Sequence, residues 1–328
     1  MTLVASPAVA VTAELDLSDL EPYRRELTGY CYRMLGSVFD ADDAVQESMM
    51  RAWRGMEGFE GRSAMRSWLY RIATNVCLDM LRGRQRRARP MDMGPAWTTE
   101  SFTGAQLPEA AWVQPIPDDR LLPESGDPAE LAAAKESVRL AFITALQFLP
   151  ARQRAVLILR EVLRWQASEV AELLDTSVAS VNSALQRARA TMSAREADAP
   201  PADVMTGDQR ELLTRYVDAF ERYDINSLVT LLREDAVMSM PPYDFWLTGP
   251  AEMHKWFLGP GFGCRGSRLV ATEANGCAAF GAYRVDPDGG HMPFAIQVIE
   301  VSGDRIIGHH NFVDPSLFPA FGLPDHLA

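Results

Sequence analysis

The sequence has few cysteines, and they form no metal-binding or redox motif. Only four occur in 328 residues, widely separated and with no Cys-x-x-Cys pair. Structural zinc sites and catalytic dithiols use closely spaced cysteines, so the pattern argues against both. We therefore expect free thiols in a reducing compartment, no metal site and no bound cofactor.

Long apolar runs are also absent. No uninterrupted apolar stretch approaches the ~20 residues that span a bilayer. The first 20 residues are rich in alanine and valine, but three of them are acidic and no base precedes Arg24, which is unlike a secretory signal. The chain is expected to be soluble and cytoplasmic, without a membrane partner.

Positive charge is scarce overall but concentrated in one segment. The formal net charge is −12. Within residues 59–89, however, eight arginines stand against two acidic residues, with Phe59, Trp68 and Tyr70 among them. Arginines neutralise phosphates, and aromatic rings stack on unpaired bases. The segment predicts binding to single-stranded or melting nucleic acid; the alternative is a solvated basic helix whose rings pack in a core.

Composition divides the chain into modules, and its length predicts two or three domains. Residues 91–130 hold six prolines and eight acidic residues but a single base, Arg120. This stretch is interpreted as a linker, either a plain tether or one that docks through its more apolar part, 111–119. The predicted modules are a flexible N-terminus (1–20), a helical domain (21–90), the linker (91–130), a second helical domain (131–196), a short linker (197–204) and a C-terminal domain (205–328).

Two helical patterns precede the linker. The first opens at Asp40, a good N-cap, and continues to Trp53 with an apolar stripe beside an acidic and amide-rich face. That face is either solvated surface or a docking site. The second pattern buries one stripe over 69–80 and places Arg71, Asn75 and Arg82 on the other side.

These segments, DADDAVQESMMRAW (40–53) and FEGRSAMRSWLYRIATNVCLDMLR (59–82), resemble the second conserved region of extracytoplasmic-function sigma factors, promoter-specificity subunits of bacterial RNA polymerase. The resemblance implies that the acidic face docks on the clamp helices of the polymerase β′ subunit, with the β subunit as a further partner. The implied docking residues are Asp40, Asp43, Gln46 and Glu47. The residues implied to hold a flipped base of the −10 promoter element are Phe59, Gly61, Arg62, Ser63, Arg71, Asn75 and Arg82.

The second helical domain contains a helix-turn-helix pattern. Residues 166–174 and 178–192 predict two helices around a short turn, after helical patterns at 131–147 and 151–165. A packing hairpin is the alternative, but the segment resembles the fourth conserved sigma region, which implies −35 recognition by the second helix. The side chains suited to phosphates and base edges are Ser180, Ser183, Gln186, Arg187 and Arg189.

The C-terminal domain mixes helices and strands. Its predicted helices are 213–220, 225–232 and 253–258, and its predicted strands are 236–240, 267–273, 277–285, 292–301 and 305–312. This order resembles a SnoaL-like domain of the nuclear transport factor 2 superfamily, an α+β cone with a curved antiparallel sheet and an internal pocket. The candidate pocket residues are Tyr216, Met238, Met240, Trp246, His254, Trp256, His291, Phe294, His309 and Phe312; core packing is the simpler explanation for the aromatics and methionines.

The predicted protein is multidomain: two all-α sigma domains, the second with a helix-turn-helix, and the SnoaL-like cone. The resemblance implies a sigma factor that takes core RNA polymerase to promoter DNA. The C-terminal domain is then expected to regulate it by docking on the linker or the sigma domains, in response to a small-molecule ligand. The alternatives are a helix-turn-helix regulator independent of core polymerase, and a fusion with a cyclase-like or isomerase-like enzyme; no catalyst is assigned, and no enzymatic activity is expected.

Overall fold

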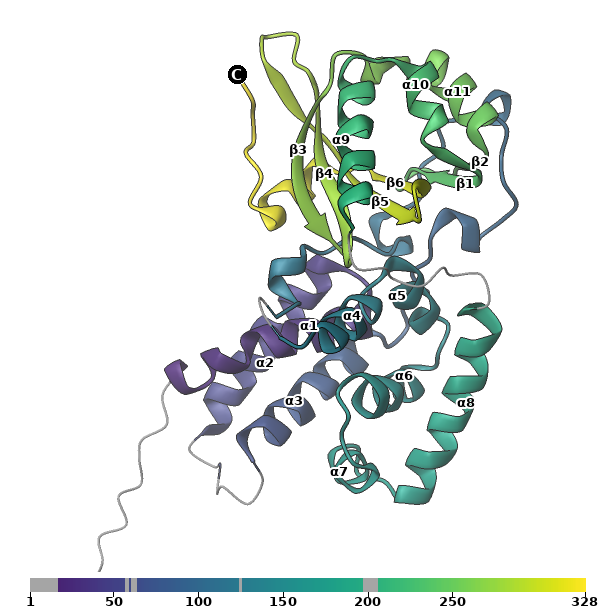
Figure 1. Ribbon diagram of the computed structural model, residues 1–328. Coiled ribbons are helices and arrows are strands. Elements are labelled where there is room, and N and C mark those ends of the chain that lie inside the picture. Colours follow the sequence, from purple (N-terminus) through teal and green to yellow (C-terminus); the bar gives the residue numbers. More distant parts are fainter. Residues whose placement is uncertain (1–16, 57–58, 60–63, 124–125, 197–205) are drawn as a thin grey trace, which may run out of the picture.

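The structure is a computed structural model that describes residues 17–56, 59, 64–123, 126–196 and 206–328. Figure 1 shows two stacked halves: helices α1 to α8 form the lower half, and the sheet with α9 to α11 forms the upper half. The predicted order of helical domains followed by an α+β domain is therefore confirmed. None of the helices in the described ranges combines the length and apolar character that a membrane crossing requires.

The first helical domain consists of α1 (Arg24–Leu35), α2 (Val38–Gly55) and α3 (Met65–Met80). Gly36 ends α1 with a φ of 72°, a left-handed conformation that suits glycine. Ser37 caps α2, because its hydroxyl accepts a hydrogen bond from the Asp40 amide at 3.2 Å. The prediction of Asp40 as the N-cap is thus wrong, because the cap lies three residues earlier. The Asp40 carboxylate is therefore available for other contacts.

The linker is not a plain tether. It contains short 3-10 turns: Pro90–Asp92, Thr99–Ser101, Glu109–Ala111 and Asp118–Arg120. Thr99–Ser101 lies against α11 of the upper half, and later parts of the linker pass between the two halves (Figure 1). Trp112, Val113 and Ile116 are at most 2% exposed. The Val113 amide donates to the Ala88 carbonyl at 3.1 Å, which satisfies backbone groups that burial would otherwise leave unpaired. The docking alternative is the one that the structure confirms.

The second helical domain contains α4 (Pro128–Glu136), α5 (Leu140–Gln147), α6 (Ala151–Leu157), a π-helical turn (Ile158–Val162), α7 (Ala167–Leu173) and α8 (Val178–Glu196). The predicted helix-turn-helix, α7 and α8, is confirmed. The prediction of a single helix over 131–147 is wrong. The helix is interrupted between α4 and α5, where Ser137 binds Arg33 of the first helical domain and Arg139 pairs with Glu300 of the C-terminal domain.

The C-terminal domain has α9 (Gly207–Glu221), α10 (Ile225–Thr230) and α11 (Pro250–Leu258) around a six-stranded sheet of order β2-β1-β6-β5-β4-β3. The strands are β1 (Leu232–Ser239), β2 (Trp246–Thr248), β3 (Arg268–Ala274), β4 (Cys277–Val285), β5 (His291–Ser302) and β6 (Arg305–Phe312). Because β1 and β6 pair in parallel, the sheet is mixed rather than wholly antiparallel as predicted.

The two faces of this sheet have different neighbours. The helices pack on one face in a core that includes Tyr216, Phe220 and Met238. On the other face Val298 and Phe312 belong to a hydrophobic cluster that continues into the helices of the lower half. Alternate strand residues point to opposite faces, so one sheet joins two cores.

Candidate functional site

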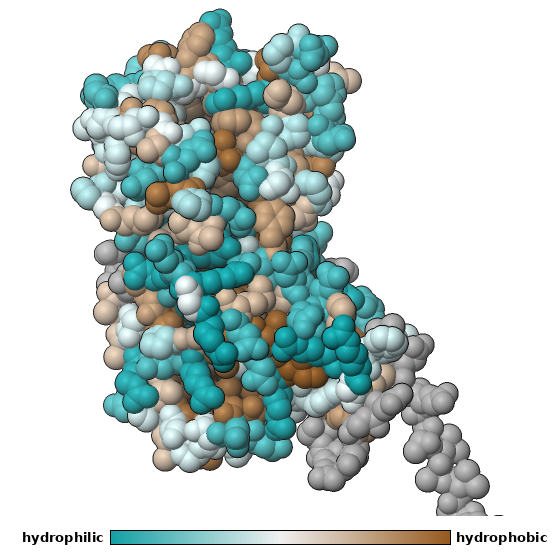
Figure 2. Space-filling model, turned by 180° about the vertical axis from the view of Figure 1, so that it is seen from behind, coloured by the Kyte–Doolittle hydropathy of each residue, from teal (hydrophilic) through white to brown (hydrophobic). Residues whose placement is uncertain are grey.

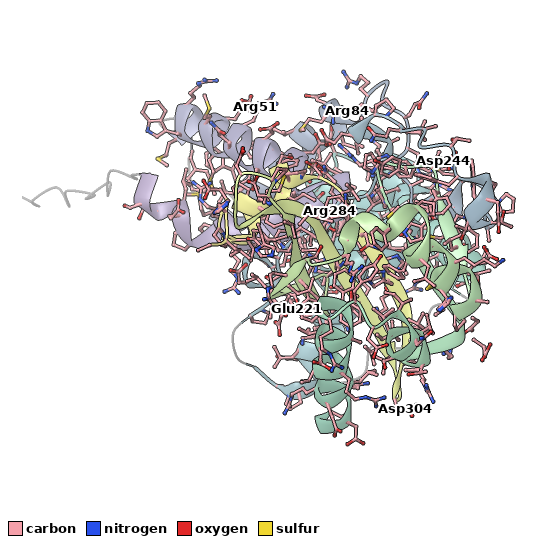
Figure 3. The ribbon with its side chains drawn as sticks, turned by 90° about the horizontal axis from the view of Figure 1, so that it is seen from above. Arg51, Arg84, Glu221, Asp244, Arg284 and Asp304 are labelled. Atoms are coloured by element: carbon pink, nitrogen blue, oxygen red, sulfur yellow. The ribbon has the colours of Figure 1, made fainter. Side chains whose placement is uncertain are left out.

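The predicted polymerase-docking residues all lie on α2, but they differ in their surroundings. Asp43 and Gln46 are exposed. Glu47 pairs with Arg51 at 2.6 Å. The Asp40 carboxylate is only 14% exposed and pairs with Arg84 at 2.9 Å and with Arg87 at 2.7 Å. Arg51 and Arg84 lie along the same edge of the molecule when it is seen from above (Figure 3).

Arg87 explains why Asp40 points inward. Its side chain is 7% exposed and donates to the carbonyls of Glu109 at 2.9 Å and Trp112 at 2.7 Å. A buried guanidinium needs a counterion, and Asp40 supplies it. Asp40 therefore fastens the linker to α2, a role that the sequence pattern did not suggest.

The predicted −10 face of α3 is partly covered. Arg71 donates to the Glu172 carbonyl of α7 at 3.3 Å and lies 3.7 Å from its carboxylate. Asn75 and Arg82 are exposed, and Arg82 pairs with Asp79 at 3.3 Å. The Phe59 ring packs 4.9 Å from the Trp68 ring. The other predicted −10 residues, Gly61, Arg62 and Ser63, lie outside the described residues.

The predicted −35 face of α8 is open. The inward residues Val181, Leu185 and Ala188 are buried, as the helical pattern predicts. The outward residues are all exposed: Ser180, Ser183, Gln186, Arg187 and Arg189. Arg187 donates to the Ser183 hydroxyl at 2.6 Å, and Arg189 pairs with Glu161 at 2.5 Å. These contacts are at the surface, where water or DNA can replace them.

Two buried arginines join the helical domains. Arg33 of α1 donates to the Ser137 carbonyl at 3.0 Å and to its hydroxyl at 2.8 Å. Arg154 of α6 donates to the Met34 carbonyl, in the last turn of α1, and to the Gln147 side chain at 2.6 Å. Burial lowers the pKa of each guanidinium to about 10, so both remain charged at neutral pH. Cations suit the negative end of a helix dipole.

The turn between β3 and β4 joins three parts of the chain. Asn275 and Gly276 have φ values of 54° and 72°, which fit the two-residue hairpin turn that Asn-Gly sequences favour. We call these two residues the hairpin tip. Asn275 is 0% exposed; its carbonyl oxygen accepts from the Ile116 amide at 3.1 Å, and its amide donates to the Tyr32 hydroxyl at 2.7 Å and the Val138 carbonyl at 2.6 Å.

Neighbouring groups complete this junction. The Tyr32 hydroxyl donates to the Gln114 carbonyl at 2.7 Å, and the Gly276 amide donates to Asp118 at 2.8 Å. Burial raises the pKa of Asp118 to about 6, although the Gly276 hydrogen bond opposes the rise. The Asn-Gly pair at 275–276 was a readable hairpin signal in the sequence; nothing in the sequence indicated its partners.

A charged cluster lies on the side of the sheet that faces the helical domains. Glu300 is 3.7 Å from Arg139 and 3.6 Å from His310, and His310 also meets Ser239 at 2.9 Å. Burial alone would raise the pKa of Glu300, but His310 and Arg139 hold it at about 2. Glu300 and His310 line a crevice of about 1850 Å³ between the halves. Seen from behind, hydrophilic residues gather across this middle level (Figure 2).

The predicted pocket residues do not converge on one cavity. Tyr216, Met238, Met240, Trp256 and His309 lie in the interior between sheet and helices. Phe312 belongs to the opposite face, Trp246 lines the interdomain crevice, and Phe294 lies under the Arg284 guanidinium at 3.3 Å. His254 bonds to Asn226 and His291 to the Gly266 carbonyl, both at 3.1 Å near the surface. Alternate residues of a strand point to opposite faces of the sheet, and this places the predicted pocket residues on different sides. The sequence did not show which face each residue occupies.

His309 forms a neutral hydrogen-bonded network. Asn311 donates to its Nδ1 at 3.0 Å, its Nε2 donates to the Tyr216 hydroxyl at 2.7 Å, and Tyr216 donates to Gln297 at 2.7 Å. Burial, followed by the charge of His310, lowers the pKa of His309 to about 3. Within the described part of the chain, no group of His, Cys, Asp or Glu side chains could hold a metal ion.

The linker also crosses the C-terminal domain. We call residues 94–107 the linker strap. Its Trp97 amide donates to the Trp246 carbonyl at 2.9 Å, its Thr99 amide to the Glu252 carboxylate at 3.0 Å, and its Leu107 amide to the Pro242 carbonyl at 2.9 Å. Phe102 packs on aromatic side chains of the C-terminal domain.

Comparison with known proteins places this geometry in a family. Residues 20–87 match sigma-70 region 2, and residues 139–192 match sigma-70 region 4. The chain is 44% identical over 315 residues to the ECF RNA polymerase sigma factor SigG of Mycobacterium tuberculosis, covering 94% of this chain and 83% of that protein. The chain belongs to the extracytoplasmic-function sigma factors.

One solved structure shows the same fold. The crystal structure of the M. tuberculosis extracytoplasmic-function sigma factor SigJ matches with a TM-score of 0.58 at 23% identity, covering 94% of this chain and 100% of that one. An NTF2-like protein from Burkholderia xenovorans LB400 matches with a TM-score of 0.29 at 13% identity, covering 33% of this chain and 83% of that one. The SigJ match shows that this sigma factor shares its fold with SigJ along nearly its whole length, the α+β domain included.

Family membership assigns the helical domains. Sigma domain 2 (α1 to α3) falls within the first matched region, and sigma domain 4 (α5 to α8) falls within the second except for the last turn of α8. Sigma factors of this family direct RNA polymerase to promoters, so the protein is a transcription regulator that binds core polymerase and promoter DNA. The linker strap and the hairpin tip lie outside both matched regions.

Proposed function

We propose that the C-terminal domain restrains this sigma factor in a closed conformation, and that promoter recognition requires the sigma domains to separate. The Asn275 contacts support this most directly. One side chain binds Tyr32 of sigma domain 2, Ile116 of the linker and Val138, two residues before sigma domain 4. Undocking the hairpin tip would therefore loosen three segments together.

Promoter geometry explains why closure would inhibit. The −10 and −35 elements are roughly 25 base pairs apart by their names, or about 85 Å along the duplex at 3.4 Å per pair. In the closed conformation α7 of sigma domain 4 touches Arg71 on the −10 face of sigma domain 2. The two domains cannot read both elements from this position, whereas α8 alone remains exposed for DNA.

The residue roles are part of the proposal. Asp43 and Gln46 suit polymerase docking because they are exposed on α2. Phe59, Arg71 and Asn75, with Gly61, Arg62, Ser63 and Arg82, would hold the −10 strand. Asp40 is better suited to fastening the linker through Arg87, and Glu47 to supporting the docking face. The outward residues of α8 would read the −35 element.

Transcription with purified core polymerase tests the restraint. Asn275→Gly removes the side-chain contacts but keeps a residue that favours the left-handed turn. We expect more run-off transcript from a cognate promoter at limiting sigma factor, and greater chain dimensions by small-angle scattering. Asn226→Ala, at an exposed α10 position, is the matched control. Unchanged transcript together with unchanged dimensions would contradict the proposal.

We infer that the C-terminal domain has no catalytic role. The only histidine inside the cone interior is neutral, and both of its ring nitrogens are hydrogen bonded among the described residues. A general base needs a pKa near the working pH and access to substrate. Turnover of a ketosteroid by the full chain, abolished by His309→Gln, would overturn this inference and restore the isomerase alternative.

A further inference from the structure

We propose that the aromatic cluster beneath the linker strap is a binding site for a neutral aromatic small molecule, and that Phe102 occupies this site until such a ligand displaces it. The idea rests on the proposed restraint by the C-terminal domain and supplies its ligand class. It differs from a pocket deep in the cone, because the site is shared between the linker and the domain surface.

One aromatic ring of the strap, that of Phe102, packs among side chains of the C-terminal domain. Phe102 makes edge contacts with Tyr243 at 5.5 Å, Phe245 at 4.8 Å and Trp256 at 4.8 Å between ring centroids. Phe245 and Trp256 are buried, at 1% and 4% exposure, whereas Phe102 itself is half-buried. The cluster thus combines rings of the C-terminal domain with one ring that comes from the linker.

The surroundings select a neutral ligand. The rings that contact Phe102 carry no charge, and Trp97 adds a further ring 6.2 Å from Phe245. The Glu252 carboxylate, on the same helix as Trp256, is already engaged by the Thr99 amide at 3.0 Å and by Lys255 at 2.7 Å. Edge-to-face packing favours a flat aromatic molecule of one or two rings over an aliphatic one.

The strap is anchored on both sides of this ring: Trp246 donates to the Gly94 carbonyl at 3.0 Å, the Thr99 hydroxyl donates to the Glu252 carbonyl at 3.1 Å, and Gln106 pairs with Tyr243. Backbone hydrogen bonds to the C-terminal domain occur at Trp97, Thr99 and Leu107. Between them, the Phe102 amide donates to the Thr99 carbonyl and the Ala105 amide to the Thr103 hydroxyl, both inside the strap. Replacing Phe102 by a ligand would therefore loosen the middle of the strap, between its anchors at Thr99 and Leu107.

Release would reach the hairpin tip through the linker. The strap leads directly into residues 109–118, which accept from Arg87 and bind Asn275 and Gly276. A ligand that binds only the strap-free state must shift the protein toward that state by its differential affinity. The aromatic ligand would thus favour the open, promoter-competent sigma factor.

Hydrogen exchange of the full chain with indole as the probe tests this. In the wild type, saturating indole should raise amide exchange at residues 97–107, whereas cyclohexanol and charged indole-3-acetate should not. Phe102→Ala should bind indole roughly tenfold more tightly, because no side chain has to leave. Phe102→Leu, which keeps apolar bulk without the ring, should fall between the two and guards against misfolding of the alanine variant.

Three outcomes would overturn the proposal: unchanged strap exchange in the wild type up to the solubility of indole, no tighter binding by either variant, or an equal effect of cyclohexanol. These outcomes are independent of transcription. If Asn275→Gly activates while indole fails to move the strap, the restraint stands and the ligand site falls. If indole moves the strap while Asn275→Gly changes nothing, the ligand site stands and the proposed restraint falls.

Discussion

Asn275 donates a hydrogen bond to the Tyr32 hydroxyl at 2.7 Å, joining residues 243 positions apart in the chain. Both side chains are fully buried. Tyr32→Phe would leave one Asn275 N–H and the Gln114 carbonyl without this partner. We expect a loss of about 1–3 kcal/mol in the free energy of unfolding, measured by urea denaturation.

Tyr30→Phe is the matched control for that change. Tyr30 is also buried, but its hydroxyl meets Thr74 at 2.7 Å inside sigma domain 2. Both variants should be destabilised, whereas only Tyr32→Phe should increase hydrogen exchange at residues 274–277. Equal exchange at the hairpin tip in the two variants would show that the tip does not depend on Tyr32.

Asp118 predicts a pH dependence of the junction. Its folded pKa of about 6 lies above its usual value, so the folded state binds the proton more tightly than the unfolded state. Ionisation of Asp118 therefore lowers the free energy of unfolding. The whole loss is present above the folded pKa, and it disappears as pH falls toward the unfolded pKa of ~3.9. Asp118→Asn should raise the free energy of unfolding by about 1–3 kcal/mol at pH 7.

The gain from Asp118→Asn should shrink steadily between pH 7 and pH 4. Denaturation curves of wild type and variant across this range measure the difference. Asp119→Asn, at the exposed neighbouring position, should show no such trend. A gain that is constant with pH would mean that Asp118 is not the group responsible.

Asp40 and Asp43 should separate stability from polymerase binding. Asp43→Arg reverses charge at an exposed position and should weaken binding to core polymerase while leaving thermal stability unchanged. Asp40→Asn leaves the buried Arg87 with only the more distant Glu109 carboxylate, at 3.6 Å, and should cost roughly 3 kcal/mol of stability. Core affinity by fluorescence anisotropy and unfolding by calorimetry would distinguish them; the same phenotype for both would refute the division of roles.

Asn75 and Arg187 should affect different promoter elements. Asn75→Ala should slow opening of the −10 region, followed by permanganate reactivity, without changing core affinity. Arg187→Ala should weaken −35 binding. If Arg187 contacts a phosphate, the slope of log affinity against log salt should fall by about one; if it reads a base edge, base preference should relax instead. Binding that is unaffected at both elements would contradict the assigned faces.

The sequence determined the local features of this protein. The helix-turn-helix, the acidic face of α2, most strands and the Asn-Gly turn depend on periodicity and on residues close together in the chain, which short-range sterics and hydrogen bonding fix. The adjacent histidines illustrate this: strand alternation sends His309 to Tyr216 and His310 to Glu300, on opposite faces.

Tertiary structure alone decided the long-range partners. Linker residues with no periodicity became buried because Ala88, Gly36 and Asn275 supply the hydrogen bonds that their backbone requires. Asp40, a predicted docking residue, pairs with Arg87 for a related reason, since a buried charge must be paired wherever the chain brings it. Such pairings depend on how the domains pack against one another. Composition and residue spacing describe only neighbours along the chain, so they cannot predict these partners.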